Sequence, residues 1–252
     1  MSARASVVDV LLASEPNASK YDLHFTVAKI PVRIHPMFWL VTGIFGLLGG
    51  RPSLVTVALW IAAVLASILV HELGHALVAR AYGWPPKITL YGMGGVASYR
   101  PTRQTTQSQV LIAFAGPGAG FVLGAVVLAA VLLSGHAVIL PGLGIPIGDG
   151  PPLMLGGGRL ELFVTYLLWV NFFWGLINLA PIQPLDGGTI VSALLSRKDP
   201  STGLVRSLKL SVGIAATLAV ASLTQGYVFL VIMFAMLGFN NWQLLSQLRQ
   251  PG

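Results

Sequence analysis

His71, Glu72 and His75 are the residues of this chain whose types and spacing point most directly to chemistry. They stand in the sequence HELGH, and the two histidines are four residues apart, so on a helix they lie on one face, one turn apart. Two imidazoles at that spacing can hold one zinc ion, and the neighbouring carboxylate can take a proton from a water that the metal activates. The stretch therefore predicts half of a hydrolytic zinc site.

The segment that carries this motif is apolar enough to cross a membrane. Residues 54–70 contain no charged side chain, and the whole chain of 252 residues is 55% hydrophobic and only 9% charged. A soluble domain has roughly 25% charged residues. The composition therefore predicts an all-α polytopic membrane protein with about six transmembrane helices and a small membrane-associated β-sheet or hairpin. The expected spans lie near residues 37–50, 54–82, 107–134, 160–179, 207–223 and 227–245.

The positions of the basic residues predict the orientation of these spans. The net charge is +7, and the basic residues lie between the apolar runs, as in cytoplasmic loops rather than in a nucleic-acid-binding surface. With six spans and a cytoplasmic N-terminus, Arg51 and Arg159 are the only two of the 15 basic residues on the outer side. We therefore expect a multi-pass protein of the cell (cytoplasmic) membrane with both termini in the cytoplasm. His71, His75 and Asp186 then lie towards that side.

A catalytic zinc ion requires a third protein ligand, and the chain has no cysteine to supply it. The sequence NLAPIQPLDGG at residues 178–188 contains two prolines, which are tolerated at membrane depth where the freed backbone groups find partners. Asp186 follows them, and besides Glu72 and the loop residue Asp199 it is the only acid near the membrane on the cytoplasmic side. We expect His71, His75 and Asp186 to bind one zinc ion per chain. Asn178 is expected to donate a hydrogen bond to the substrate or its oxyanion, or alternatively to a neighbouring helix.

Two short segments have β-strand patterns. Residues 22–35 alternate apolar and polar side chains, with Ile30, Val32 and Ile34 on one side, and Pro31 predicts an edge strand. Residues 87–99, with glycines at 92, 94 and 95, predict a hairpin or re-entrant loop, or a simple surface turn. A transmembrane substrate must unwind before hydrolysis, and adding it to a sheet edge would replace its lost hydrogen bonds. The candidate edges are the strand near 30–35 and the hairpin residues, namely Gly94, Gly95 and Val96.

Glycine and asparagine residues in the later part of the chain lead to three further expectations. Gly116, Gly120 and Gly124 recur every four residues in the third expected span, a stripe that permits close contact between helices. Residues 135–158 are rich in glycine and proline and are expected to form a loop. In the fourth expected span, Asn171 and Asn178 are seven residues apart and are expected on one helix face.

Together these motifs resemble the site-2 protease family of intramembrane zinc metalloproteases. The resemblance rests on HELGH, NLAPIQPLDGG, the glycine hairpin GMGGVA at 92–97, AGPGAG at 115–120 and IPVRIHP at 30–36. It implies zinc held by His71, His75 and Asp186, with Glu72 as general base and Asn178 near the substrate. It further implies cleavage of membrane-anchored regulatory proteins near the cytoplasmic side of the lipid bilayer.

The short N-terminal strand and the predicted N-in layout resemble the prokaryotic branch related to sporulation-type proteases, although the PDZ and CBS domains that its members often carry are not expected here. Many relatives have GPxxN where this chain has Gly120, so the substrate contact of that asparagine is missing. We expect one intramembrane protease domain over residues 1–252, with a cytoplasmic tail at 1–21, core motifs at 30–196 and additional spans at 207–245.

Two alternatives remain open from the sequence. The first is a zinc-binding membrane protein or transporter without protease activity, against which the intact Glu72 and the small number of intramembrane acids argue. The second is a prenyl-protein endopeptidase with a glutamate as third ligand, but Glu161 lies on the far side of the membrane in the predicted topology. The substrate is expected to be a transmembrane protein, with no nucleic acid as partner.

Overall fold

The computed structural model describes residues 16–48, 53–92, 94–140, 144–151 and 158–249. These residues group into two compact units. The first unit comprises Glu15–Thr102 and Ala115–Ile177, and the second comprises Arg103–Phe114 and the chain from Asn178 onward. Each unit is described separately below.

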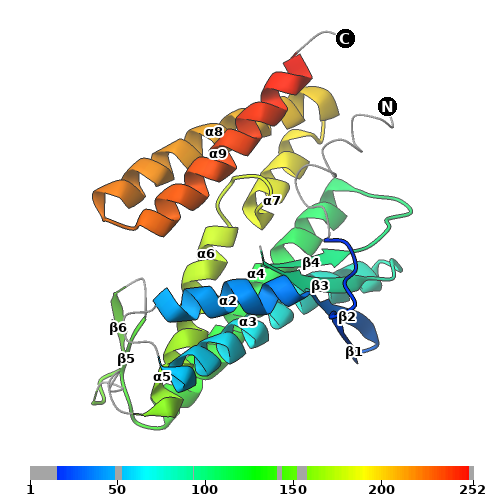
Figure 1. Ribbon diagram of the computed structural model, residues 1–252. Helices are drawn as coiled ribbons and strands as arrows, with labels where there is room; N and C mark the ends of the chain where they lie inside the picture. Colours follow the sequence, from blue (N-terminus) through cyan, green and yellow to red (C-terminus); the bar gives the residue numbers. More distant parts are fainter. Residues whose placement is uncertain (1–15, 49–52, 93, 141–143, 152–157, 250–252) are drawn as a thin grey trace. The chain divides into compact units, whose positions relative to one another are not determined.

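A four-stranded sheet lies in the first unit, in the order β1-β2-β3-β4 (Figure 1). Its strands are β1 (Leu23–Val27), β2 (Ile30–Ile34), β3 (Lys87–Tyr91) and β4 (Gly94–Ser98). The pair β1–β2 is antiparallel, β2–β3 is parallel and β3–β4 is antiparallel. The hairpin predicted at 87–99 is therefore present as β3 and β4.

The segment predicted as one edge strand is instead a hairpin whose second strand is central. The chain turns at Ala28 and Lys29, which have φ angles of 49° and 64°, as a tight hairpin turn requires. The edge prediction for Pro31 is wrong because β2 has β1 on one side and β3 on the other. Pro31 is tolerated there because it pairs with Thr26 of β1, and the register with β3 begins one residue later, at Val32.

Two helices pack with this sheet around the core of the first unit. Helix α2 (Pro36–Leu48) lies against α3 (Leu54–Ala81), and the Trp60 Nε1 atom donates to the Thr42 carbonyl at 3.1 Å. A capping box between Ser53 and Thr56 begins α3. As predicted, alternate side chains of β2 turn to one side. They are buried in a core whose central members are Ile30, Val32, Ile34, Phe38, Ile88 and Leu90.

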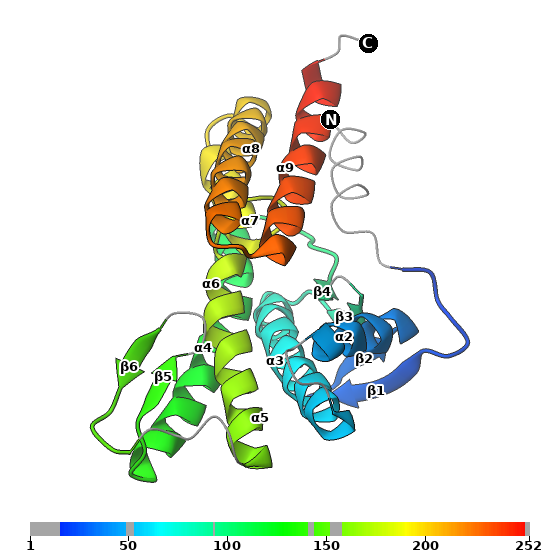
Figure 2. The ribbon, with the colours of Figure 1, turned by 60° about the vertical axis from the view of Figure 1, so that its left-hand side comes forward.

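The next helix, α4 (Thr106–Leu133), is followed by a small hairpin of β5 (Val138–Leu140) and β6 (Ile145–Ile147). Residues 135–158 were expected to form a loop, and this is wrong for the two strands (Figure 2). The hairpin is stabilised by apolar burial, since Val138 packs with Val131 and Leu168. Its strands have only three residues each, too few for their alternation to be recognised against the surrounding glycines and prolines.

The fourth expected span is present but is not a uniform α-helix. It consists of α5 (Arg159–Leu168), a π-helical segment η1 (Trp169–Trp174) and α6 (Gly175–Asn178). A π-turn adds one residue to a helical turn, which shifts the following side chains by about 100° around the axis. Asn171 lies inside this segment. The prediction that it shares a helix face with Asn178 assumed a uniform α-helix, and the helix is not uniform there.

Three helices form most of the second unit: α7 (Asp186–Leu195), α8 (Pro200–Thr224) and α9 (Val228–Arg249). Helices α8 and α9 run side by side as an antiparallel hairpin that turns at Gly226, whose φ is 74° (Figures 1 and 2). Leu208, Leu244 and Leu245 form the apolar contact between them. Helix α8 begins earlier than predicted, because Asp199 caps it by accepting hydrogen bonds from the amides of Ser201 and Thr202.

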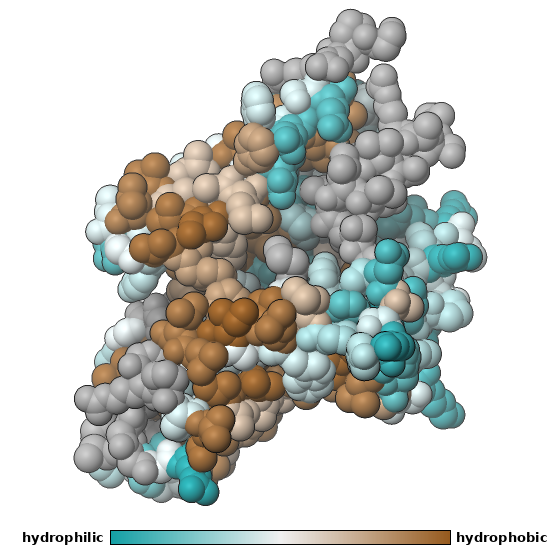
Figure 3. Space-filling model, in the orientation of Figure 1, coloured by the Kyte–Doolittle hydropathy of each residue, from teal (hydrophilic) through white to brown (hydrophobic). Residues whose placement is uncertain are grey.

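Within the described residues, five helices are long and apolar enough to cross a membrane: Leu54–Ala81, Thr106–Leu133, Arg159–Asn178, Pro200–Thr224 and Val228–Leu248. The chain is thus a helical, multi-pass membrane protein. The first expected span, near residues 37–50, forms α2, whose 13 residues extend about 20 Å, less than the roughly 30 Å of a bilayer core. Exposed apolar side chains nevertheless cover α2 and the α8–α9 pair, whereas polar residues gather over the sheet (Figure 3).

Candidate metal centre

His71 and His75 lie one turn apart on α3 with their ring nitrogens together. The two Nε2 atoms are 3.1 Å apart, and the ring planes are inclined at 81°. Two nitrogens bound at 2.0–2.1 Å to one tetrahedral ion would be about 3.3 Å apart. His75 is only 8% exposed. The pair therefore has the spacing that two ligands of a common zinc ion require.

Gly116 of α4 keeps space open beside these nitrogens. A Cβ atom built on Gly116 would lie 2.8 Å from His71 Nε2 and closer still to His75 Nε2. On the other helix, a Cβ on Gly74 would lie 2.8 Å from the Ala115 carbonyl carbon, so the two backbones approach closely. The predicted glycine stripe thus does more than pack helices, because at Gly116 it leaves room at the ring nitrogens. A metal ion fits this arrangement, whereas any larger residue would fill the space.

Glu72 is buried beneath strand β4. It is 5% exposed, and a Cβ atom on Gly95 would lie 2.6 Å from its Oε1 atom. The glycine hairpin predicted at 87–99 therefore has its backbone against Glu72. Among the described strands β4 is an edge of the sheet, since it pairs with β3 alone. Gly94, Gly95 and Val96 all belong to this strand.

An aromatic stack fixes the hairpin to the end of α3. The Trp84 ring lies between those of Tyr82 and Tyr99, with centroids 5.2 Å and 5.8 Å away. The Trp84 Nε1 atom donates to the Thr102 hydroxyl at 3.2 Å. This group was not among the predicted features, although three aromatic residues flanking a predicted hairpin were a usable signal.

Asn171 is a second residue that sequence reasoning left without a role. Its Nδ2 atom donates to Ser67 Oγ at 2.9 Å and to the Leu167 carbonyl at 2.8 Å. Ser67 lies one turn before His71 on α3. A Cβ atom on Gly120 would lie 3.3 Å from Asn171 Oδ1, so the glycine at the position of the family asparagine faces an asparagine from another helix.

The remaining predicted site residues lie in the second unit. Asp186 is the first residue of α7, preceded by the N-cap residue Leu185, and Asn178 is the last residue of α6. The first turn of α7 packs on the preceding loop, because Cβ atoms on Gly187 and Gly188 would both collide with its backbone. Both glycines therefore lie directly against the backbone of the loop that precedes them.

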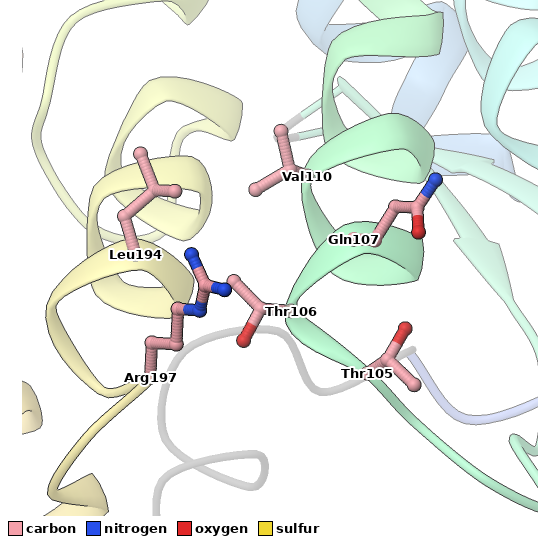
Figure 4. Close-up of a pocket in the computed structure, with 6 residues that line it drawn as sticks. All are labelled: Thr105, Thr106, Gln107, Val110, Leu194 and Arg197. Carbon is pink, nitrogen blue, oxygen red and sulfur yellow. The ribbon is translucent and has the colours of Figure 1, made fainter.

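A separate hollow of about 440 Å³ lies in the second unit between the start of α4 and the end of α7. Figure 4 shows the Arg197 guanidinium group reaching towards Thr106 across this hollow. Its lining residues are Thr105, Thr106, Gln107, Val110, Leu194 and Arg197. None of the predicted site residues is among them, so the hollow is distinct from the candidate metal centre.

Comparison with known proteins identifies the family. A model of peptidase family M50 matches residues 59–145 and 156–220, a range that includes both HELGH and NLAPIQPLDGG. The chain belongs to peptidase family M50. The membership predicted from the sequence motifs is thereby confirmed.

Individual relatives agree with this assignment. The chain is 33% identical over 204 residues to zinc metalloprotease MJ0392 of Methanocaldococcus jannaschii, covering 80% of this chain and 52% of that protein. It is 27% identical over 173 residues to stage IV sporulation protein FB of Bacillus subtilis, covering 68% of this chain and 50% of that protein. The chain thus spans about half the length of these M50 relatives.

A solved structure has a similar fold. The site-2 protease from Methanocaldococcus jannaschii superposes with a TM-score of 0.53 at 27% sequence identity, covering 92% of this chain and 97% of that one. The polytopic helical fold with a small sheet is therefore shared with a member of the M50 family.

Proposed function

We propose that this chain is an intramembrane zinc metalloendopeptidase. The observation that carries the proposal is the pair of Nε2 atoms on α3, 3.1 Å apart, beside the space that Gly116 leaves open. The names of its relatives, which include a zinc metalloprotease, support the same activity. We take the whole chain, residues 1–252, as one catalytic domain.

Zinc is held by His71, His75 and Asp186 in this proposal, at one ion per chain. The three side chains offer two imidazole nitrogens and one carboxylate oxygen, a donor set that zinc accepts. Bound zinc would lower the pKa of a water molecule towards about 7 and polarise the scissile carbonyl.

Glu72 acts as the general base and later as the acid. Its burial under β4 excludes bulk water from the carboxylate, which then accepts the proton of the attacking water and delivers it to the departing amine. The Asn178 side chain donates a hydrogen bond to the substrate or to the developing oxyanion.

The substrate is a membrane-anchored protein, and strand β4 receives its unwound segment. Gly94, Gly95 and Val96 offer the free edge of the sheet next to Glu72, where main-chain hydrogen bonds replace those lost from the substrate helix. Ala97→Pro removes a main-chain donor that the β3–β4 register directs to the outer edge of this strand, and it should lower cleavage of a transmembrane substrate with zinc content unchanged. Equal cleavage by the variant would remove β4 from the proposal.

Both termini lie in the cytoplasm in the proposed topology. In this topology α2 crosses the membrane as a short first span, in addition to the five longer helices. The native chain has no cysteine, so single cysteines introduced near Lys20, Arg51 and Arg197 can be labelled separately from either side of the membrane. Labelling of positions 20 and 197 from the same side supports this topology. Labelling from opposite sides would mean that α2 does not cross.

The activity is tested by reconstituted cleavage of a fluorescent single-span substrate by the wild-type chain and Glu72→Gln, with zinc measured in both. We expect equal zinc content and a loss of roughly 10²–10⁴-fold in rate for the variant. Equal rates would defeat the mechanism. Bound zinc with no cleavage by the wild type would favour a zinc-binding membrane protein without protease activity.

A further inference from the structure

The loop that precedes Asp186 needs hydrogen-bond partners from outside itself. Pro181 and Pro184 interrupt the helical pattern, so the carbonyl and amide groups between them are not paired as in a helix. An unpaired backbone group inside a membrane is strongly unfavourable. In this chain, side chains from α8 and α9 supply the missing partners.

Ser211 of α8 binds the loop at two points. Its Oγ atom accepts a hydrogen bond from the Gln183 amide at 3.1 Å and donates to the Pro181 carbonyl at 3.4 Å. The side chain is fully buried, so water does not compete for these bonds. One hydroxyl thus fixes the spacing of Pro181 and Gln183.

Asn241 of α9 binds the same loop from the next helix. Its Nδ2 atom donates to the Gln183 carbonyl at 2.7 Å and to the Leu237 carbonyl of its own helix at 2.8 Å. The residue is fully buried, and within the described chain its Oδ1 atom has no partner. Asn241 therefore holds the loop through its Nδ2 atom, which is a hydrogen-bond donor.

The position of the loop determines the position of the first turn of α7, because the two segments are in close contact. The Leu185 amide donates to the Ile182 carbonyl at 2.8 Å, and the Ile182 side chain is fully buried. Gly187 and Gly188 lie so close to the backbone of residues 179–183 that neither has room for a Cβ atom. Any shift of the loop therefore shifts Asp186.

We propose that Ser211 and Asn241 are positioning residues of the metal centre, holding residues 181–183 so that the Asp186 carboxylate is placed to bind zinc. This inference rests on the proposed function. Asn241 lies beyond the residues matched by the M50 model, which end at 220. The last helix, expected from sequence as an additional span, thereby contributes to the site through hydrogen bonds.

The test compares Asn241→Ala and Ser211→Ala with two matched controls. Asn240→Ala removes an exposed amide one residue away on α9, and Ser207→Ala removes a buried hydroxyl on α8 that has no partner in the described chain. Each full-length protein is purified in detergent and stripped of metal. Its affinity for Zn²⁺ is measured by competition with a chromogenic chelator, and the absorption spectrum of its Co²⁺ complex is recorded.

We expect a roughly 10-fold or greater loss of Zn²⁺ affinity and a changed Co²⁺ spectrum for Asn241→Ala and Ser211→Ala. The two controls should match the wild type, and Ser211→Thr, which keeps the hydroxyl, should recover part of the affinity. If Asn241→Ala fails to fold, the Ser211 variants decide the question.

A lower unfolding temperature with unchanged Zn²⁺ affinity and Co²⁺ spectrum would mean that the two residues are merely structural, and would overturn the inference. If the wild-type chain itself binds no Zn²⁺, or binds it equally well after His71→Ala, the proposed function fails and this inference fails with it. The two failures are therefore distinguishable.

Discussion

His71 and His75 lie on an unbroken helix of 28 residues, whereas Asp186 begins a helix of 10 residues that follows a loop with two prolines. On α3 the interior backbone groups are paired within the helix, so the backbone position of the histidines does not depend on side-chain hydrogen bonds from other helices. The loop before Asp186 lacks such pairing, so its position depends on hydrogen bonds from Ser211 and Asn241. We therefore expect added side-chain volume to act directly on the ligands in the first unit. In the second unit we expect it to act only by displacing Asp186, and the loss of Ser211 or Asn241 should act in the same way.

The largest effect is expected at Gly116, where volume acts directly on the ligands. Gly116→Ala places a methyl group among the two Nε2 atoms, so Zn²⁺ binding and proteolysis should both be lost while the helices still form. Gly43→Ala on α2, with nothing within 4 Å of the added atom, is the control. It should be neutral or stabilise by about 0.5–1 kcal/mol. Normal metal content in Gly116→Ala, measured by atomic absorption, would contradict this prediction.

The second prediction concerns Glu72 alone, because a substitution at Gly95 should affect the general base and leave the histidine ligands in place. Gly95→Ala brings a methyl group to about the position of the Glu72 carboxylate, which must turn away. Cleavage should fall by roughly 10²–10⁴-fold while Zn²⁺ content stays at the wild-type value. The measurement is single-turnover cleavage together with metal analysis of the same sample. Loss of zinc along with activity would show that β4 supports the histidines as well.

The third prediction concerns Asp186, the proposed zinc ligand in the second unit. Gly187→Ala forces the first turn of α7 away from the backbone of Leu179 and Ala180. Zn²⁺ affinity should fall by roughly 10–100-fold, a smaller change than at Gly116, because Asp186 is displaced rather than blocked. The chelator competition used for the Asn241 variants measures this directly. An affinity as low as that of Gly116→Ala would mean that the two halves do not differ as described.

The smallest effect concerns the start of α8, the helix that carries Ser211. Hydrogen bonds from Thr202 and Ser201 lower the pKa of Asp199 from 3.8 to about 2. Because the folded-state pKa is the lower one, this contribution is fully present above about pH 4 and is lost as the pH falls towards 2. Thermal unfolding in detergent should show this decline for the wild type and not for Asp199→Asn. The change will be small because the group is exposed to solvent.

Local patterns predicted much of this molecule, because they depend on periodicity. The four-residue spacing of His71 and His75, the alternation of Ile30, Val32 and Ile34, and the hairpin at 87–99 are all present. The glycine stripe was also recognised, although the sequence could not reveal that Gly116 faces ring nitrogens while Gly120 faces Asn171. Contacts of that kind are set by the neighbouring helix.

Features that depend on distant parts of the chain were missed or misjudged. Pro31 was assigned to an edge because the pairing of β2 with β3, more than 50 residues later, leaves no local trace. Ser211 and Asn241 stand in apolar helices, where a lone polar residue has many potential partners. Their bonds to residues 181–183 are set by the packing of α8 and α9, which the hydrophobic pattern alone does not define.

The π-helical segment at Trp169–Trp174 has a consequence for the rotational phase of its helix. In a uniform α-helix two residues seven apart lie on one face, so Asn171 and Asn178 would share an orientation if residues 171–178 were α-helical throughout. The insertion separates the two phases, so the early part of the helix can keep Asn171 on Ser67 while the later part turns independently. Deleting one residue between Asn171 and Asn178 should return the segment to α-helical pairing and leave the flanking turns in their present orientations, because a π-turn accommodates one inserted residue.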